Sequence, residues 1–219
     1  DFISECQKVL TESIINKKRI SANKSPATHI WPWSQGPYPN MPTFKEKFSL
    51  SGGIVTAVDL LKGLAKLTGL EAPNISGATG FIDTNYKNKL DAALSILDQH
   101  DFCYIHIEAP DECGHMGDAK LKTKAIEDFD QQICAPIKQY CHKNKNTIIL
   151  ILPDHPTPCR LKTHTRSAVP FILYSPQERP TYSTQGYTEE MAEKTTLQYS
   201  ASWDLITKVI KNNTILPIE

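Results

Sequence analysis

The side chains with the clearest chemical potential are carboxylates and imidazoles, which gather in two stretches of the sequence. An apolar run at residues 102–107 ends abruptly, and Asp111 and His115 follow within one short turn. A second apolar run, at 148–152, is followed by Asp154 and His155, and His164 comes nine residues later. Mixed oxygen and nitrogen ligands suit Zn²⁺, Mn²⁺ or related divalent ions. The two stretches therefore predict a metal site.

The number of these side chains bears on the kind of site. Five ligands are too many for one ordinary zinc site and too few for two closed ones. Two carboxylates in one cleft would repel each other, and a divalent cation removes that conflict. Two ions a few ångströms apart, each with open positions, are the arrangement that clamps phosphoryl oxygens during a displacement. A single D-x-x-x-H motif could equally be a hydrogen-bonded turn, but three segments that share one edge favour metal binding.

The elements that must position these residues can be predicted from hydrophobic periodicity. Strands are expected at 54–58, 102–107, 147–152 and 169–174. Helices are expected from Asp59 to a stop at Gly69, from a cap at Asp83 or Thr84 through Leu97, from Asp118 through about 140, and over 201–210. Strands that alternate with such helices indicate an α/β fold, with a largely parallel sheet and helices on both faces. Ligands of such sheets bind beyond the carboxyl ends of the strands, where the Asp and His residues fall.

Composition and charge narrow the class of protein and its partners. Lys+Arg and Asp+Glu both number 24 in 219 residues, which argues against nucleic acid or an anionic membrane as the partner. No apolar run approaches the roughly 20 residues of a membrane span, and the acidic N-terminus is not a secretory signal. Six scattered cysteines without a C-x-x-C pair predict reduced thiols and a cytoplasmic location.

Several motifs carry a resemblance to a known family. HIEAPDECGHMGDAKLKTKAIEDFD and LPDHPTPCRLKTHTRSAVPFILY, with the earlier WPWSQG, AVDLLKGLAKLTGL and GATGFIDTNYKNK, resemble the archaeal-type branch of the cofactor-independent phosphoglycerate mutases. That branch belongs to the alkaline phosphatase superfamily. The likeness covers most of residues 20–175, and it is weak after Ser175.

The resemblance implies an activity and a division of the ligands. It implies interconversion of 3-phosphoglycerate and 2-phosphoglycerate through a phosphoserine, without bisphosphoglycerate. Asp111, His115 and His164 would hold one divalent ion, and Asp154 and His155 a second. Mn²⁺ is the first expectation for both, with Zn²⁺, Co²⁺ or Mg²⁺ as alternatives, and the substrate is a small phosphoglycerate.

The chain also departs from the family pattern. Members begin with an Asp-Gly turn that supplies a metal ligand, followed by the serine nucleophile and an inserted substrate domain, and neither that turn nor the serine is found before Ser51. The sequence thus resembles the C-terminal portion of an alkaline-phosphatase-like domain that is incomplete at its N-terminal side. Residues 1–48 would be the end of the substrate domain and a linker, and residues 49–219 the metal-binding part. No catalytic residue is assigned in this chain, and the serine is expected upstream.

Two other functions are compatible with the same residues. One is a phosphatase or phosphotransferase of the same superfamily that acts on another small phosphoester. The other is an inert metal-binding fragment, which predicts that the 219 residues alone lack activity. The sequence assigns neither substrate-binding residues nor an oligomeric state.

Overall fold

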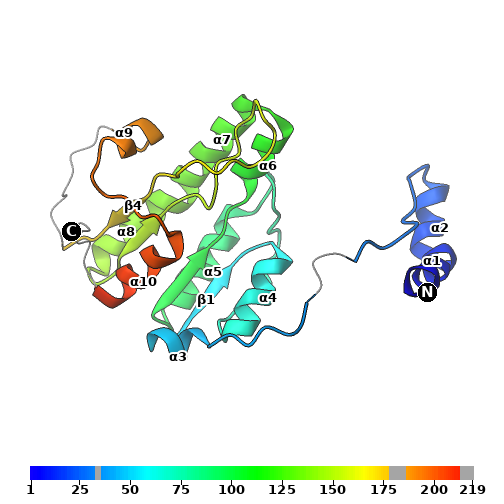
Figure 1. The fold of residues 1–219 in the computed structure, drawn as a ribbon, viewed down its shortest axis with the longest axis horizontal. Helices are drawn as coiled ribbons and strands as arrows, with labels where there is room; N and C mark the ends of the chain where they lie inside the picture. The colour runs from blue at the N-terminus through cyan, green and yellow to red at the C-terminus, as the bar shows by residue number, and fades with distance from the viewer. Residues whose placement is uncertain (33–35, 178–185, 213–219) are drawn as a thin grey trace. The chain divides into compact units, whose positions relative to one another are not determined.

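The computed structural model describes residues 1–32, 36–177 and 186–212, and the chain divides into two compact units, 1–40 and 41–219 (Figure 1). The smaller unit holds helices α1 (Phe2–Glu12) and α2 (Ile14–Ser21). Ser13 separates them, because its backbone is extended and its hydroxyl accepts a hydrogen bond from the Ile15 N–H. Neither helix buries an apolar side chain. The assignment of residues 1–48 to a substrate domain and linker stays a prediction.

The larger unit alternates strands with helices. In chain order its elements are α3 (Phe44–Phe48), β1 (Gly52–Val55), α4 (Asp59–Thr68), α5 (Tyr86–Leu97), β2 (Phe102–Ile105), α6 (Ala109–Met116), α7 (Ala119–Phe129), η1 (Asp130–Cys134), α8 (Ala135–Lys143), β3 (Ile149–Ile151), β4 (Ile172–Tyr174), α9 (Glu189–Glu193) and α10 (Ser202–Asn212).

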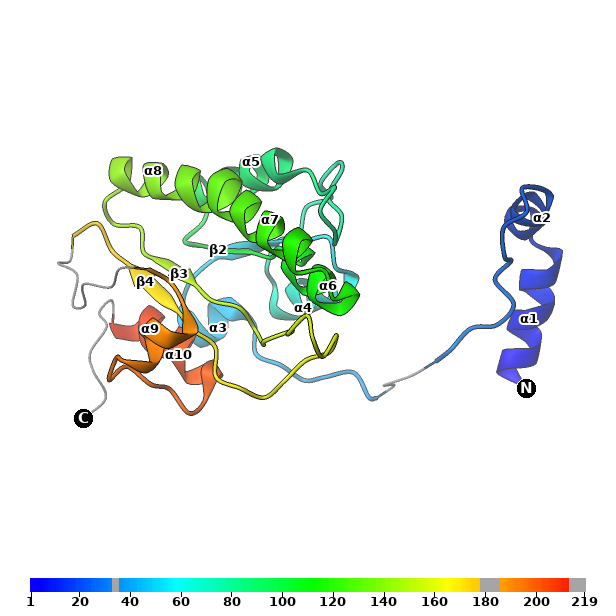
Figure 2. The same cartoon turned by 90° about the horizontal axis from the view of Figure 1, so that it is seen from above.

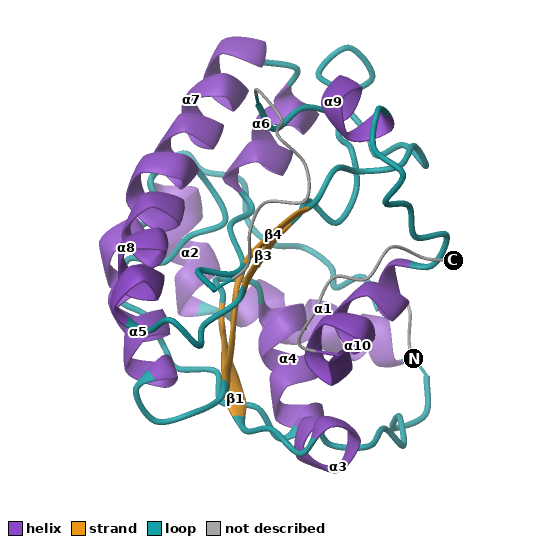
Figure 3. Cartoon of the chain, turned by 90° about the vertical axis from the view of Figure 1, so that its left-hand side faces the viewer, coloured by secondary structure: helices purple, strands orange, loops and turns teal. Residues whose placement is uncertain are grey.

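Strands β1 and β2 form the parallel pair that leads to the site. Gly52 lies opposite Phe102, and Val55 lies opposite Ile105. Gly52 is required by this pairing, because a Cβ there would collide with the Phe102 backbone carbonyl. Val55 is fully buried and packs against α5, which together with α4 lies in the connection between the two strands. Figure 3 shows helices on both sides of the strands, with α5, α7 and α8 on one side and α4 and α10 on the other. The predicted α/β class and its parallel pairing are confirmed.

Strands β3 and β4 differ from the predicted parallel arrangement. They pair antiparallel, with Ile149 opposite Tyr174 and Ile151 opposite Ile172. A parallel return requires a crossover, usually a helix, but the segment between these strands contains no helix or strand. This irregular connection carries Asp154, His155 and His164, so the chain turns back while it presents these side chains.

The long helix predicted from Asp118 is interrupted by a π-helical turn. The Asp118 side chain accepts a hydrogen bond from the Leu121 N–H, which confirms the predicted cap of α7. At η1 the Ala135 N–H bonds to the Asp130 carbonyl, five residues back. Pro136 follows directly, and its ring would clash with the carbonyl four residues earlier in a regular helix. The wider turn relieves that clash, so α7 and α8 continue as one rod (Figure 2).

Two further helix ends test the predictions. The stop of α4 at Gly69 is confirmed, with φ 70° in the left-handed region. The predicted cap of α5 at Asp83 or Thr84 is wrong, because Asn85 caps the helix through the Asn88 N–H. Both predicted residues are engaged in the preceding loop: the Thr84 hydroxyl accepts from the Thr79 N–H, and Asp83 accepts from the Thr79 hydroxyl.

All six cysteines, which lie within the described residues, are free. Across residues 1–32, 36–177 and 186–212, no helix has both the length and the apolar character needed to cross a bilayer.

Candidate metal centre

Helix α6 positions the first two predicted ligands. The sequence predicted only a short turn here, but residues Ala109–Met116 form two turns of helix. Pro110 sits in the first turn, where a missing N–H costs nothing, and Gly117 ends the helix with φ 76°. Asp111 and His115 are four residues apart and therefore share one face of the helix. Their side chains approach to 3.3 Å, from Nε2 of His115 to Oδ2 of Asp111.

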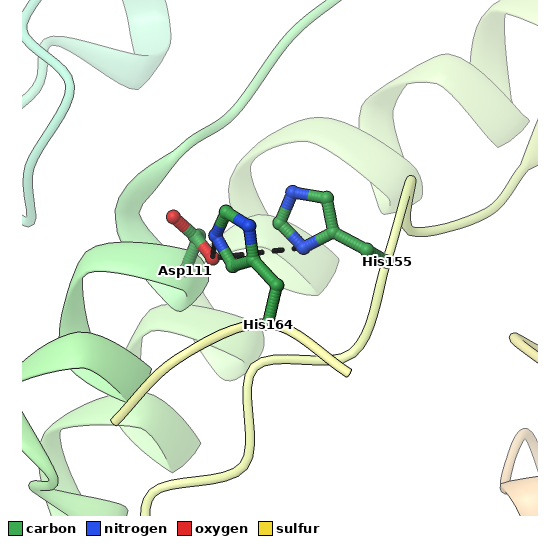
Figure 4. A group of neighbouring side chains, drawn as sticks. All are labelled: Asp111, His155 and His164. Carbon is green, nitrogen blue, oxygen red and sulfur yellow. Dashed lines mark ion pairs between the residues drawn. The ribbon is translucent and has the colours of Figure 1, made fainter. Parts of the chain in front are cut away.

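The irregular connection after β3 brings the other three residues to this face. It is folded back on itself by backbone hydrogen bonds, including one from the Thr165 N–H to the Pro156 carbonyl. The His155 and His164 rings lie against each other at a tilt of 32°, with centroids 3.7 Å apart, and both imidazoles lie beside Asp111 (Figure 4). All five predicted residues therefore meet in one region at the carboxyl end of the β1–β2 pair.

Asp111, His115 and His164 form the tightest group. Nε2 of His115 lies 2.9 Å from Nε2 of His164, and Nε2 of His164 lies 3.4 Å from Oδ1 of Asp111. Ligand atoms at about 2.0–2.2 Å from one shared ion are separated by roughly 3.0–3.5 Å. The observed separations of 2.9, 3.3 and 3.4 Å match that geometry. Asp111 offers Oδ2 to His115 and Oδ1 to His164, so the three side chains could hold one divalent ion through both carboxylate oxygens.

A hydrogen bond on the far side of His115 supports this fit. Its Nδ1 lies 3.0 Å from the backbone carbonyl of Lys162. A carbonyl can only accept, so Nδ1 donates, and the neutral ring then presents a lone pair at Nε2 toward Asp111 and His164. Second-sphere carbonyl partners fix metal-binding histidines in this way. Lys162 adopts a left-handed backbone, φ 55°, which is uncommon for a residue other than glycine.

Asp154 and His155 form a looser group beside the first. Oδ2 of Asp154 lies 3.3 Å from Nε2 of His155, and Nδ1 of His155 lies 3.9 Å from Oδ1 of Asp111. The side chain of Asp154 is 69 % exposed, against 26 % for Asp111. Donor atoms of Asp111, His155 and His164 also fall within 4.8 Å of one another. These residues could support a second ion, whose ligand set they leave incomplete and open.

Three residues that the sequence analysis did not select hold Asp111 in place. Thr157 is only 3 % exposed, and its hydroxyl donates a hydrogen bond to Oδ1 of Asp111. The Lys122 ammonium donates to the Thr157 carbonyl at 2.7 Å. Gly114 lets the Thr157 backbone approach α6, since a Cβ at this position would lie 2.5 Å from the Thr157 carbonyl oxygen. The available signal was the place of Thr157 within D-H-P-T-P and of Gly114 within D-x-x-x-H.

Burial shifts the pKa of two ionisable groups near the cluster, His106 and Glu108. Burial lowers the pKa of His106, although Asp154 and Asp111 act in the opposite direction. Burial also raises the pKa of Glu108, and the neighbouring Glu112 and Asp111 add to the effect. Nδ1 of His106 lies 3.3 Å from the Thr56 hydroxyl.

Replacing Thr157 with valine tests this support. Valine keeps the shape of the side chain but cannot donate to Asp111, so the carboxylate loses its fixed orientation. Loss of an outer-shell partner typically weakens metal binding by about 10- to 100-fold, and we expect Thr157→Val to do so for Mn²⁺ in isothermal titration calorimetry. Thr123→Val is the control, because the Thr123 hydroxyl donates to the Ala119 carbonyl of its own helix. Equal affinities in the two variants would refute the role given to Thr157.

Comparison with known proteins defines the class to which this fold and site belong. The family model described as the metalloenzyme superfamily matches residues 2–205, and the chain belongs to this superfamily. A protein of Geobacter sulfurreducens named probable 2,3-bisphosphoglycerate-independent phosphoglycerate mutase is 45 % identical over 192 residues. The protein of Methanosarcina barkeri named 2,3-bisphosphoglycerate-independent phosphoglycerate mutase is 41 % identical over 212 residues.

The alignments cover most of this chain but only about half of each relative. The alignments cover 88 % and 96 % of this chain but 48 % and 53 % of the relatives, so the chain spans about half the length of the curated relatives it matches. The predicted resemblance to a C-terminal portion of these mutases is confirmed to that extent.

Solved structures give the same proportion. A Pyrococcus horikoshii protein superimposes with a TM-score of 0.75 at 31 % identity, covering 88 % of this chain and 50 % of that one. The cofactor-independent phosphoglycerate mutase of Thermoplasma acidophilum superimposes with a TM-score of 0.57, covering 90 % of this chain and 46 % of that one. At 23 % identity, this second match supports the fold alone.

Proposed function

We propose that this chain is the metal-binding part of a 2,3-bisphosphoglycerate-independent phosphoglycerate mutase. The observation that carries the proposal is the convergence of Asp111, His115 and His164 at the spacing of ligands to one ion. It occurs in a chain 41–45 % identical to proteins that bear this name. The activity is interconversion of 3-phosphoglycerate and 2-phosphoglycerate, as in glycolysis.

Five residues would act as metal ligands, and two further groups would orient them. Asp111, His115 and His164 would hold one divalent ion, and Asp154 and His155 would contribute to a second, with Mn²⁺ as the first expectation. Bound ions would polarise the phosphoryl oxygens and neutralise charge that develops during transfer. The Lys162 carbonyl keeps His115 in the tautomer that offers Nε2, and Thr157 keeps Asp111 oriented.

Parts of the proposal concern the protein beyond these residues. The phosphoserine nucleophile and an additional aspartate ligand are proposed to come from an upstream segment, with residues 1–48 as the end of a substrate domain and linker. The open second ligand set is consistent with an additional contribution. A cytoplasmic location is proposed because all six cysteines, each in the described part of the chain, are free thiols.

The direct test is turnover of 3-phosphoglycerate by the protein that contains this chain. The protein is purified, depleted with chelator and reloaded with Mn²⁺, and formation of 2-phosphoglycerate is followed by coupling to enolase. We expect activity that requires metal and does not require added bisphosphoglycerate. Release of inorganic phosphate in place of 2-phosphoglycerate would favour the phosphatase alternative.

The isolated 219 residues supply a second test. Because the proposed nucleophile lies outside them, we expect this chain to bind Mn²⁺ but to show no mutase turnover. The measurement is the same coupled assay, run beside a metal titration that demonstrates a folded site. Turnover by the 219 residues alone would contradict the upstream serine and would place the nucleophile within this chain.

A further inference from the structure

A lysine occupies a core position of α5, on the stripe of the helix that also buries Ala93 and Ile96. Lys89 is 1 % exposed and is the largest fully buried side chain among the described residues. Its ammonium donates to two backbone carbonyls, that of Thr79 at 3.2 Å and that of His106 at 3.4 Å. Burying a charge is costly unless an opposite charge compensates it. The position of Lys89 therefore requires a compensating group.

The two hydrogen bonds of Lys89 do not supply that compensation. Both acceptors are neutral carbonyls, and in the described part of the chain no carboxylate forms a direct ion pair with this ammonium. Burial accordingly lowers the pKa of Lys89, and the negative charge of Glu108 acts in the opposite direction. The charge of the lysine is thus opposed by its surroundings and favoured by one nearby carboxylate.

The Glu108 carboxylate and the Lys89 ammonium meet the same short piece of the loop before α5. Lys89 holds the carbonyl of Thr79, and the next residue, Gly80, lies under the Glu108 side chain. A Cβ at Gly80 would collide with Oε2 of Glu108, so the absence of a side chain there lets the carboxylate enter. The two charges therefore approach each other across residues 79 and 80.

Glu108 also begins the helix that carries the first two proposed metal ligands. It is the N-cap residue of α6, and its carbonyl accepts hydrogen bonds from the Asp111 N–H at 2.8 Å and the Glu112 N–H at 3.3 Å. The start of α6 thus gathers three carboxylates, and one of them belongs to the proposed ligand Asp111. Without a bound cation these negative charges repel one another. The buried ammonium is a positive charge placed behind them.

We propose that Lys89 is an internal counter-charge for the carboxylates of the metal centre, which stabilises the metal-free chain and opposes the charge of a bound divalent ion. The inference rests on the proposed function, in which Asp111 is a metal ligand. In the metal-free chain the ammonium attracts the carboxylates at the start of α6. Once a cation is bound, the same ammonium repels it, because charges interact beyond direct contact through an interior of low polarity. Lys89 would therefore keep metal affinity below the value that the ligands alone would give.

Lys89→Met tests the counter-charge through two measurements that need no turnover. Mn²⁺ affinity is measured by calorimetry with the purified 219-residue chain, and stability is measured by urea denaturation in the presence of chelator. We expect the variant to bind Mn²⁺ roughly three- to tenfold more tightly and to unfold at a lower urea concentration than the wild-type chain. The opposite signs are diagnostic, because a purely structural role would lower stability without tightening metal binding.

Two further variants separate charge from hydrogen bonding and from position. Lys89→Gln removes the charge but keeps an N–H group that can donate, so it should tighten Mn²⁺ binding as Lys89→Met does, with a smaller loss of stability. Lys87→Met is the control, because Lys87 lies two residues earlier on α5 and pairs with Asp91 on an exposed surface. We expect both measurements to stay at wild-type values in Lys87→Met.

Each outcome decides the inference. If Lys89→Met is unfolded without metal, refolding on addition of Mn²⁺, followed by circular dichroism, would support the counter-charge, and failure to refold would overturn it. Unchanged or weaker Mn²⁺ binding in Lys89→Gln would also overturn it. Absence of Mn²⁺ binding by the wild-type chain would overturn the metal centre together with this inference. The mutase proposal is decided separately, by formation of 2-phosphoglycerate in the enolase-coupled assay.

Discussion

Asp111→Asn should remove Mn²⁺ binding at the tighter group of ligands almost completely. This one carboxylate is contacted by three imidazoles and one hydroxyl, those of His115, His155, His164 and Thr157. Replacing the carboxylate with an amide removes the negative charge that faces all three imidazoles. Even a partner outside the first coordination sphere is worth about 10- to 100-fold in affinity. We therefore expect a loss greater than about 100-fold, measured by calorimetry with the purified chain.

The matched control for this substitution is Asp91→Asn. Asp91 lies on α5, where it pairs with Lys87 on an exposed surface, and its replacement makes the same change of charge away from the cluster. We expect native metal affinity in Asp91→Asn. Retention of tight metal binding by Asp111→Asn would show that the ligand set has been assigned to the wrong residues.

Gly114→Ala should destabilise the chain and weaken metal binding at the same time. The added methyl would lie 2.5 Å from the Thr157 carbonyl and 2.9 Å from the Thr157 Cγ2. The first of these is backbone, which cannot rotate away, so the segment that carries His155 and Thr157 must move off α6. Overpacking of this kind typically costs about 1–3 kcal/mol. A displaced Thr157 also loses its hydrogen bond to Asp111, with the consequence for Mn²⁺ expected of Thr157→Val.

The control for Gly114 is Gly63, which lies inside α4, where an added methyl group would meet nothing within 4 Å apart from its chain neighbours and the backbone of its own helix. Gly63→Ala should stabilise the chain by about 0.5–1 kcal/mol, because alanine has the higher helix propensity. Both substitutions gain that propensity, so the difference between their free energies of unfolding isolates the clash. Urea denaturation of the metal-free proteins measures it, and equal stabilities would contradict the close approach of Thr157 to α6.

The parts of the fold that followed from the sequence are those with local causes. A carboxylate three residues before the Leu121 N–H predicts a cap, and a glycine after an apolar periodic stretch predicts the end of α4; both depend only on neighbours in the chain. The cap at Asn85 was missed because its competitor Thr84 is engaged by Thr79 in the preceding loop. The antiparallel pairing of β3 with β4 was missed because a short apolar run gives no direction for its partner.

In the candidate site, too, the features that the sequence predicts are those that depend on residue type and local spacing. Side chains that can ligate a metal are recognisable by type, so Asp111, His115, Asp154, His155 and His164 were all selected, and the structure brings them together. The groups that orient them act through backbone atoms or through ordinary residues. The Lys162 carbonyl is not visible in a side-chain pattern, and the importance of Gly114 lies in the space that it leaves for Thr157. Such roles depend on contacts between segments far apart in the sequence, which periodicity does not encode.

The spacing of the ligands along the chain has a consequence for how the protein is made. Asp111 and His115 come together as soon as α6 forms, but His164 follows His115 by 49 residues. At about 5–20 residues per second of synthesis, roughly 2–10 s separate the two halves of the site. During that interval the growing chain presents a carboxylate and an imidazole without their partners. The newly made protein therefore passes through a state in which only two of the proposed ligands, Asp111 and His115, would be available to a metal ion.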